Sequence, residues 1–435
     1  MFYAYPAITF GRCAMTRKFF FSLFFLCLLF SFANCKGDDD DSADDSDDDN
    51  DDNDDNDDSS DDDDDDLTLP EGWRMELVDD GDETGYDNQI ALISNNNQII
   101  YYGRMEDLPD IISLRLAIKE GENWNVDSLP FTKTGGSLPL LIDRDDHLHL
   151  SLMRFGEEVH HNILEYGNDC DGELQFETIL QAEMRTVFTM AIDSANIPHF
   201  FVEGYGDLIY YLCWNGAAWD FSLFGYGTTP SMAIDNNDYL HVAFYVPYDF
   251  NDIDDDIDEE QQGKVIHYFN TEGDWSWETI DYIIDNEPID SLDPDSVLDL
   301  YTKVDPTGAM HVGYQVKFVD DHEESQDSIY KIMYATKADG QWKRSTVHVN
   351  GWLRSFTIDD QSRPHFLVYD WNEEGLVWLT REDGESSWTS TWLGLEPCHT
   401  GLAIDADGYA HISYSPTYNE DKETIHLYYL TNRPE

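Results

Sequence analysis

Six aspartates in this sequence are each followed, six residues later, by a histidine. The pairs are Asp143/His149, Asp193/His199, Asp235/His241, Asp305/His311, Asp359/His365 and Asp405/His411. A carboxylate near an imidazole can serve acid–base catalysis or hold a metal ion. An active site is normally built once, however, whereas a device that stabilises the fold recurs. We therefore interpret the pairs as structural. The Asp is expected to accept backbone N–H groups in its turn, and the His to bridge backbone groups between repeats.

Three acidic segments interrupt the repetition. Residues 249–260 carry eight acids, residues 281–295 six and residues 320–327 five. Carboxylate oxygens are the ligands that Ca²⁺ prefers, so a calcium site is one interpretation, and a docking surface for a basic partner is another. Solvated loops of a protein adapted to saline water are the third. The candidate calcium ligands are Asp252, Asp254, Asp256 and Asp258.

Four aromatic residues stand at the ends of strands that open with the repeated histidine. They are Tyr205, Tyr248, Trp371 and Tyr418. If the strand ends share one face of the fold, exposed rings there can stack on sugars. Packing beneath the loops is the alternative.

The strands that must position these residues also recur. The text around the pairs reads LLIDRDDHLHL, MAIDSANIPHF, MAIDNNDYLHV, TKVDPTGAMHV, FTIDDQSRPHF and LAIDADGYAHI. A decayed copy, LISNNNQII, has Ser94 and Ile100 at the same offset. Each unit is predicted to contain four strands, which in the third unit are 188–193, 199–203, 208–213 and 219–223. Periods of about 50 residues with several short strands are typical of a propeller.

The two ends of the repeat region complete each other. The last unit stops after its third strand, residues 425–430, and residues 72–78 (GWRMELV) supply a matching fourth strand. We therefore predict an all-β fold, a seven-bladed β-propeller closed by an N-terminal strand. The fourth strands open with an aromatic residue that is expected to pack between blades. These residues are Trp124, Phe176, Trp219, Trp277, Trp342 and Trp388.

The repeat resembles the Asp-box (BNR, sialidase-like) propellers and secreted bacterial proteins with an I-D-x-x-G-x-x-H-h-x-Y repeat. The strict Asp-box, S-x-D-x-G-x-T-W, is absent. In the sialidase-like family, three arginines bind the substrate carboxylate beside a Tyr/Glu nucleophilic pair and an acid Asp, with an N-terminal Arg-Ile-Pro motif. Arg104-Met105 does not match that motif, whereas Arg115, Arg154 and Arg185 are available. The resemblance leaves open a sialidase-like glycoside hydrolase or lyase.

The N-terminal region has the features of a targeting signal. Residues 19–32 form an apolar run after Arg17 and Lys18, as in the hydrophobic region of a signal peptide that starts at Met15. The sequence Phe32-Ala33-Asn34-Cys35 resembles a bacterial lipobox, although Asn34 departs from the usual Gly or Ala. The resemblance implies that residues 1–34 are removed and that Cys35 is lipidated. The expected location is the bacterial cell envelope, at the outer membrane or the cell surface.

An acidic tether follows the lipobox. Residues 38–66 contain 21 Asp, and such dense like charge repels itself and stays extended. The expected domains are therefore a lipidated tether, 35–66, and the propeller, 67–435. The formal net charge of -67 excludes unaided nucleic-acid binding. Cys170, Cys213 and Cys398 leave open whether a disulfide forms.

We predict from these features a lipid-anchored, monomeric propeller that binds a glycan or a protein without catalysis, with Ca²⁺ as a candidate cofactor. Two alternatives remain: the sialidase-like hydrolase or lyase, and a structural scaffold of an envelope complex.

Overall fold

The computed structural model describes residues 69–105, 112–133, 138–155, 161–170, 173–247, 263–271, 274–283, 297–319, 328–337, 340–382, 385–416 and 425–434. They belong to one compact unit, Leu67–Glu435. The described residues form strands and turns, and they include no helix long and apolar enough to span a membrane. The apolar run 19–32, Cys35 and the acidic tether lie outside these residues.

The strands group into antiparallel four-stranded blades, whose strands follow one another in the order A, B, C, D. Blade 1 consists of β2 (Thr84–Leu92), β3 (Gln98–Met105), β4 (Ile112–Glu120) and β5 (Asn123–Lys133). Blade 2 consists of β6 (Leu140–Ile142), β7 (Leu148–Phe155), β8 (His161–Asn168) and the first half of β9 (Gln175–Ile192). Blade 3 consists of the second half of β9, β10 (Pro198–Gly204), β11 (Leu208–Trp214) and β12 (Trp219–Tyr226).

The remaining blades repeat the pattern. Blade 4 consists of β13 (Thr228–Ile234), β14 (Leu240–Val246), β15 (Gly263–Thr271) and β16 (Asp274–Ile283). Blade 5 consists of β17 (Val297–Val304), β18 (Met310–Val319), β19 (Ser328–Thr336) and β20 (Lys343–Val349). Blade 6 consists of β21 (Gly351–Ile358), β22 (Pro364–Asp370), β23 (Gly375–Thr380) and β24 (Thr389–Trp392). Blade 7 consists of β25 (Pro397–Ile404), β26 (Ala410–Pro416), β27 (Leu427–Thr431) and β1 (Arg74–Asp79).

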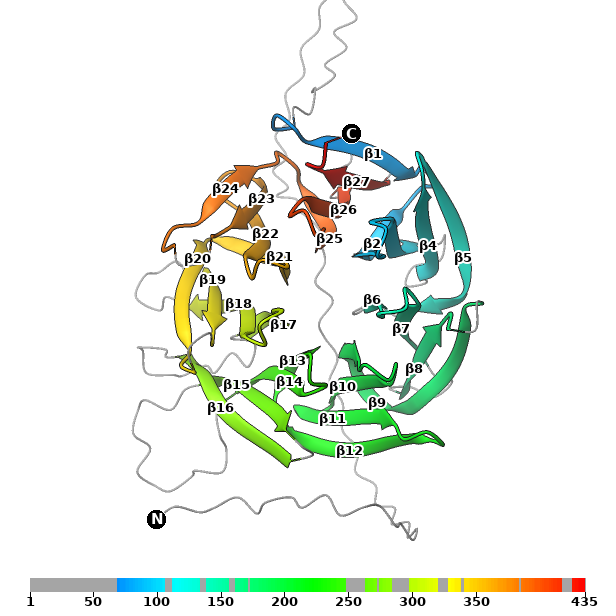
Figure 1. Ribbon diagram of the computed structural model, residues 1–435, viewed down its shortest axis with the longest axis vertical. Coiled ribbons are helices and arrows are strands. Elements are labelled where there is room, and N and C mark those ends of the chain that lie inside the picture. The colour runs from blue at the N-terminus through cyan, green and yellow to red at the C-terminus, as the bar shows by residue number, and fades with distance from the viewer. Residues whose placement is uncertain are drawn as a thin grey trace, which may run out of the picture. The chain divides into compact units, whose positions relative to one another are not determined.

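The ring closes through the first strand of the folded unit. β1 pairs antiparallel with β27, with Arg74 opposite Thr431 and Leu77 opposite Tyr428. This pairing completes blade 7 and places the blades in a ring (Figure 1). The prediction of a seven-bladed propeller closed by an N-terminal strand is confirmed. Closure matters because it removes the open edge that blade 7 would otherwise present.

Aromatic residues at the start of each D strand join neighbouring blades. Trp73, beside β1, lies edge-on to Trp378 of blade 6, with ring centroids 5.6 Å apart, and Trp124 of blade 1 lies 5.4 Å from Tyr429 of blade 7. The remaining pairs are Phe176–Phe131, Trp219–Tyr166, Trp275–Phe201, Trp342–His267 and Trp388–Tyr334. Every blade interface therefore contains such a contact.

One residue predicted for these interfaces was wrong. In blade 4 the interface ring is Trp275, which packs near Phe201 and Phe224 of blade 3. Trp277, two residues further along β16, is 53% exposed. The aromatic rings of blade 3 lie opposite the beginning of β16, so only the earlier tryptophan reaches them.

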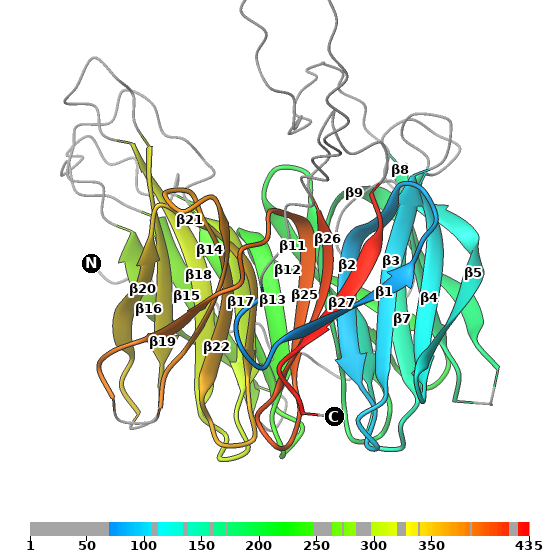
Figure 2. The ribbon, with the colours of Figure 1, turned by 90° about the horizontal axis from the view of Figure 1, so that it is seen from above.

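The strand directions divide the turns between two faces. Among the described residues, the A–B turns and C–D hairpins lie at one end of the blades, which we call the lower face, and the B–C and D–A connections lie at the other end, the upper face (Figure 2). The repeated Asp–His pairs thus belong to the lower face. The ends of the B strands belong to the upper face.

Candidate functional site

Each repeated aspartate organises an A–B turn at the lower face. In blade 7, Asp405 Oδ1 accepts the N–H groups of Asp407 at 3.0 Å and Tyr409 at 2.8 Å. The same two bonds occur at residues 143, 193, 235, 305 and 359. The fourth residue of each turn has a left-handed backbone, which favours Gly, Asn or Asp; Gly408, for example, has φ 87°.

The second oxygen of each aspartate faces the histidine of its own blade. His411 Nε2 donates to Asp405 Oδ2 at 3.2 Å, and His411 Nδ1 accepts from the Tyr429 hydroxyl at 2.6 Å. Blades 2, 3 and 5 repeat this Asp–His–Tyr triad. In blade 4 a second histidine, His267, takes the tyrosine's place, and in blade 6 Trp378 stacks on His365.

The expected role of the histidines was therefore wrong in one respect. They do not bridge backbone groups between blades, because both ring nitrogens of a histidine such as His411 are engaged by side chains of its own blade. Burial lowers the pKa of His411 even though the Asp405 carboxylate opposes the shift. A neutral imidazole with one donor and one acceptor fits this arrangement.

The same correction applies to His311 of blade 5, which was also expected to bridge backbone groups between blades. Its Nδ1 accepts from the Tyr334 hydroxyl at 2.6 Å, and its Nε2 lies 3.3 Å from Asp305 Oδ2. Asp305 and Tyr334 both belong to blade 5, so the ring of His311 fastens the A–B turn to the C strand of its own sheet. The other histidines that contact side chains of their own blade in this way are His149, His199, His241 and His365.

Blade 1 lacks the triad, and its equivalent residues differ by one from the predicted Ser94 and Ile100. The turn bond from Ile93 N to Asn97 O, 3.1 Å, corresponds to that from Asp405 N to Tyr409 O. Ile99 pairs with Ala91 as His411 pairs with Ala403. Leu116 lies opposite Tyr101, as Tyr429 lies opposite Ser413. Blade 1 thus replaces Asp, His and Tyr with Ile93, Ile99 and Leu116.

Of the four aromatics predicted for the upper face, the two that the structure describes lie in different blades. Tyr205, 46% exposed, lies in the β10–β11 turn of blade 3, whereas Trp371 follows β22 in blade 6. Tyr248, Tyr418 and the candidate calcium ligands Asp252, Asp254, Asp256 and Asp258 lie outside the described residues.

Trp371 belongs to an upper-face cluster that the sequence did not reveal, which we call the blade-6 platform. Trp371 lies edge-on to Trp352, centroids 5.4 Å apart, and to Tyr330 at 4.6 Å. Trp352 lies opposite Tyr369 across β21 and β22 and is 40% exposed. The Arg354 guanidinium lies 5.1 Å from the Trp352 ring centroid and 5.9 Å from that of Tyr369. The platform therefore combines an exposed indole, supporting rings and one cation.

A bulge in β21 creates this arrangement. Ser355 pairs with Leu367, yet Leu353 pairs with Val368, so Arg354 is the extra residue. Bulges bend a strand and redirect side chains, and they are frequent near functional sites. Arg354 Nη2 also reaches Pro397 O in blade 7 at 3.4 Å, and its backbone oxygen accepts from the Tyr301 hydroxyl of blade 5 at 3.2 Å.

Beyond Arg354, ionisable side chains from blades 7 and 1 meet at the upper face. His399 Nδ1 lies 3.2 Å from Asp87 Oδ1, and its ring lies 5.5 Å from that of Tyr86. Burial lowers the pKa of His399, but its hydrogen bonds to Asp87 and Cys398 prevail and raise it to about 9. Burial raises the pKa of the Cys398 thiol. The hydrogen bond to His399 and the charges of His399 and Arg354 outweigh burial, so the pKa of the thiol is lowered overall. Perturbed groups of this kind mark candidate chemistry.

The arginines considered for a sialidase-like site each pair with a different carboxylate. Arg115 Nη1 bonds Asp79 at 2.8 Å, Arg154 Nη2 bonds Glu165 at 2.7 Å, and Arg185 Nη1 bonds Glu203 at 2.7 Å. The three arginines belong to strands of blades 1, 2 and 3, respectively. No disulfide joins Cys170, Cys213 and Cys398.

Comparisons with known proteins agree with the propeller fold. No protein-family model matches the chain, and no curated protein matches its sequence. A similar solved structure is an ulvan lyase of polysaccharide lyase family PL25 bound to -[GlcA(1-4)Rha3S]-. Its TM-score is 0.53 at 11% identity, over 81% of this chain and 95% of that chain.

Weaker likenesses, with TM-scores below 0.5, extend to other propellers. An α-L-arabinofuranosidase from Fusarium graminearum has a TM-score of 0.46 at 10% identity, covering 80% of this chain and 92% of that chain. The NanB sialidase from Streptococcus pneumoniae has a TM-score of 0.40 at 10% identity, covering 82% and 70%. At these identities the likeness shows the fold alone, and the chain is a β-propeller.

Proposed function

We propose that this propeller binds a glycan on its upper face through the blade-6 platform. The observation that carries the proposal is the Trp352 indole, which is 40% exposed yet supported edge-on by Trp371 and flanked by Arg354. A ring held in this way loses little conformational entropy on binding, and the C–H face of a sugar buries apolar area against it. The Arg354 donors can then bond sugar oxygens.

The described contacts support a binding role more directly than a catalytic one. In binding sites, aromatic side chains bury the ligand, and a small number of polar groups fix its orientation. The ulvan lyase with TM-score 0.53 is bound to a saccharide, but that likeness concerns the fold. The proposal therefore rests on the platform.

The test is a glycan array probed with the purified full chain and with Trp352→Ala. We expect the wild-type chain to bind a restricted set of glycans, and Trp352→Ala to lose them. Trp277→Ala is the matched control, since Trp277 is a 53% exposed tryptophan on the outer strand β16. Equal binding by all three proteins, or no binding by the wild type, would remove the platform as a glycan site. The second outcome would favour the scaffold alternative.

Repeating the array with EDTA addresses calcium separately. Loss of binding that added Ca²⁺ restores would support a calcium-assisted site. Unchanged binding would show that glycan binding does not depend on calcium.

The second candidate is acid–base chemistry on the bound glycan, favoured by the Asp87–His399 pair and the neighbouring Cys398 at the same face. Each glycan bound on the array is incubated with the chain and assayed for new reducing ends and for an unsaturated product. Turnover by the wild type that His399→Ala abolishes, with binding retained, would make the protein an enzyme. Absence of turnover leaves the binding function.

We also propose that Cys35 is lipidated and holds the propeller at the bacterial envelope through the tether 38–66. Two signals in the sequence support it, the apolar run 19–32 and the lipobox-like Phe32–Cys35. Labelling with a fatty-acid analogue should mark the wild type and not Cys35→Ala. Release of unlabelled wild-type protein into the medium would contradict the anchor.

A further inference from the structure

Blade 2 departs from the other blades at its lower face. Asp143, His147 and Cys170 each offer one ligand atom, and these atoms all lie within 4.8 Å of one another. Asp143 and His147 belong to the β6–β7 turn, whereas Cys170 follows β8 in the C–D hairpin. The two segments are tied together: Leu148 N donates to Asp169 Oδ1 at 2.7 Å, and Asp169 N donates to Leu148 O at 3.3 Å.

The carboxylate of this cluster is already oriented. Asp143 Oδ1 accepts N–H bonds from Asp145 at 2.8 Å and His147 at 2.9 Å, and Oδ2 accepts from His149 Nε2 at 3.2 Å. His149 Nδ1 in turn accepts from the Tyr166 hydroxyl at 2.6 Å. In protein metal sites, hydrogen bonds from surrounding residues fix the orientation of the side chains that coordinate the ion. The repeated triad therefore supplies a rigid anchor.

Two changes specific to blade 2 add the other ligands. The residue four positions after the aspartate is His147 here, while the other five turns have Ile197, Tyr239, Ala309, Arg363 and Tyr409. Its Nδ1 lies 3.0 Å from Asp143 Oδ2. The hairpin facing this histidine carries the exposed Cys170. Two independent substitutions thus place a nitrogen and a sulfur donor beside one fixed oxygen.

We propose that Asp143, His147 and Cys170 bind one Zn²⁺ ion at the lower face of blade 2. An imidazole, a thiolate and a carboxylate are the donors that zinc accepts, and Ca²⁺ does not take sulfur or nitrogen ligands. On binding, the thiol releases its proton to solvent and His147 coordinates as the neutral imidazole. The ion takes the place of the His147–Asp143 contact, while His149 keeps its bond to Asp143. Three protein ligands leave a fourth position for water.

The geometry is compatible with the bond lengths required. Ligands about 2.0–2.3 Å from a tetrahedral ion lie roughly 3.3–3.8 Å apart, so atoms within 4.8 Å need only small side-chain adjustments. Cys170 is exposed and sits in a hairpin, and His147 is partly exposed. Both can make that adjustment without moving the core. The site would join the A–B turn to the C–D hairpin of blade 2.

The test is a zinc titration of the reduced, metal-free full chain against a chromophoric chelator, repeated with Co²⁺. We expect one tightly bound Zn²⁺ per chain, a thiolate-to-cobalt charge-transfer band, and a Tm that rises with added zinc. Cys170→Ser and His147→Ile, the second borrowing the residue of blade 3, should each lose the band and weaken zinc binding at least 100-fold. Cys213→Ser is the matched control and should behave as the wild type.

The charge-transfer band separates this site from weak binding by the tether, because residues 38–66 contain no cysteine. Binding without the band, or a band that persists in Cys170→Ser, would overturn the proposal. So would a wild-type chain that holds no zinc. Cys170→Ser changes an exposed residue and should keep the wild-type near-ultraviolet circular dichroism, so its result does not depend on the folding of His147→Ile.

Discussion

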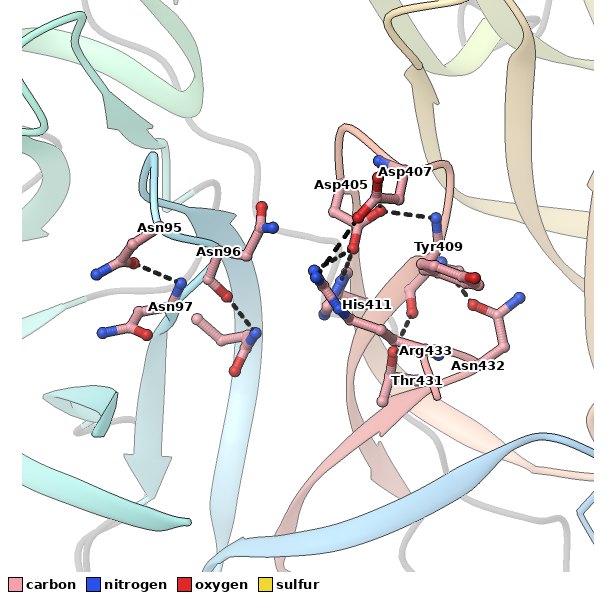
Figure 3. Close-up of polar contacts among 12 residues, drawn as sticks. Asn95, Asn96, Asn97, Asp405, Asp407, Tyr409, His411, Thr431, Asn432 and Arg433 are labelled. Atoms are coloured by element: carbon pink, nitrogen blue, oxygen red, sulfur yellow. Dashed lines mark hydrogen bonds and ion pairs between the residues drawn. The ribbon is translucent and has the colours of Figure 1, made fainter. Parts of the chain in front are cut away.

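Blades 7 and 1 are neighbours whose A–B turns have the same backbone but are stabilised by different side chains (Figure 3). In blade 7, Asp405 accepts two backbone N–H groups and bonds both His411 and Arg433. In blade 1, Ile93 and Ile99 occupy the equivalent positions. The Asn97 N–H bonds the Asn95 side chain at 2.8 Å instead. The backbone of the turn is kept while its polar centre is exchanged for an apolar one.

The contrast indicates that the aspartate and the histidine depend on each other, whereas the tyrosine alone is replaced in blades 4 and 6. In blade 1 all three change together, to Ile93, Ile99 and Leu116, and Ile99 and Leu116 pack in one buried cluster that Ile93 adjoins. A buried polar network is favourable when every member is satisfied, and a well-packed apolar set can replace it. An aspartate or a histidine left without the other should be worse than either.

The largest expected effect comes from breaking the triad of blade 7. Asp405→Ala leaves two backbone N–H groups, His411 and Arg433 without their shared acceptor, at a site where Asp405 is 3% exposed. Removing one partner of a buried pair costs about 3–5 kcal/mol. We expect that loss of unfolding free energy in a urea titration. A cost below about 1 kcal/mol would mean that the triad does not stabilise the blade.

A histidine placed alone in blade 1 should cost somewhat less. Ile99→His buries an imidazole without its carboxylate and removes apolar contacts, for about 2–3 kcal/mol. Adding Ile93→Asp supplies the missing acceptor and should return part of that stability. The measurement is chemical unfolding of the wild type, the single and the double variant. A double variant less stable than Ile99→His would contradict the equivalence of blades 1 and 7.

The fold was predictable from the sequence wherever its signals are local. The six Asp–His repeats and the decayed copy sufficed for the blade number, and the missing fourth strand of the last unit predicted the closing strand, because strand order and turn chemistry are local signals. The blade-1 equivalents were displaced by one residue, since without an aspartate only the turn bond of Ile93 identifies the position. The partners of a histidine such as His311 were missed because its tyrosine lies 23 residues further along the chain, on another strand.

The functional faces were harder to predict because they depend on register and on distant segments. Counting back from the A–B turn of blade 6 would pair Trp352 with Asp370, but the bulge at Arg354 shifts it to Tyr369. The platform was therefore missed. No Cys/His spacing in the sequence suggests zinc, because His147 and Cys170 come from different turns.

A variant in which apolar residues replace the Asp–His–Tyr triad of blade 7 should have nearly the wild-type stability at neutral pH, but its stability should depend differently on pH. The variant combines Asp405→Ile, His411→Ile and Tyr429→Phe, the last keeping the ring that packs against Trp124. We expect it within about 2 kcal/mol of the wild type at pH 7. The burial that lowers the pKa of His411 acts with Arg433 and Arg74, against Asp405.

The sign follows from that lowered pKa. Between about pH 6.5 and the lower pKa of the folded state, the histidine is protonated in the unfolded chain but neutral in the folded protein. Its contribution to stability is therefore present above about pH 6.5 and is lost as the pH falls toward the folded pKa. Unfolding free energies at pH 7 and pH 5 should therefore differ more in the wild type than in the triple variant. The other histidines are common to both proteins and cancel. Equal differences would mean that His411 is readily protonated in the folded state.

The smallest effect on stability is expected at the upper face, where the blades are not alike. Trp352 is 40% exposed, so Trp352→Ala should cost about 1 kcal/mol or less in unfolding free energy. Its effect on glycan affinity should be larger, about 30-fold, as for an aromatic anchor worth about 2 kcal/mol. Calorimetric titration with a glycan bound on the array measures this loss. Asp405→Ala, at a temperature where it remains folded, should bind as the wild type does, because its turn lies at the opposite face. If Trp352→Ala lost stability and kept its affinity, the platform would belong with the repeated turns as a packing device.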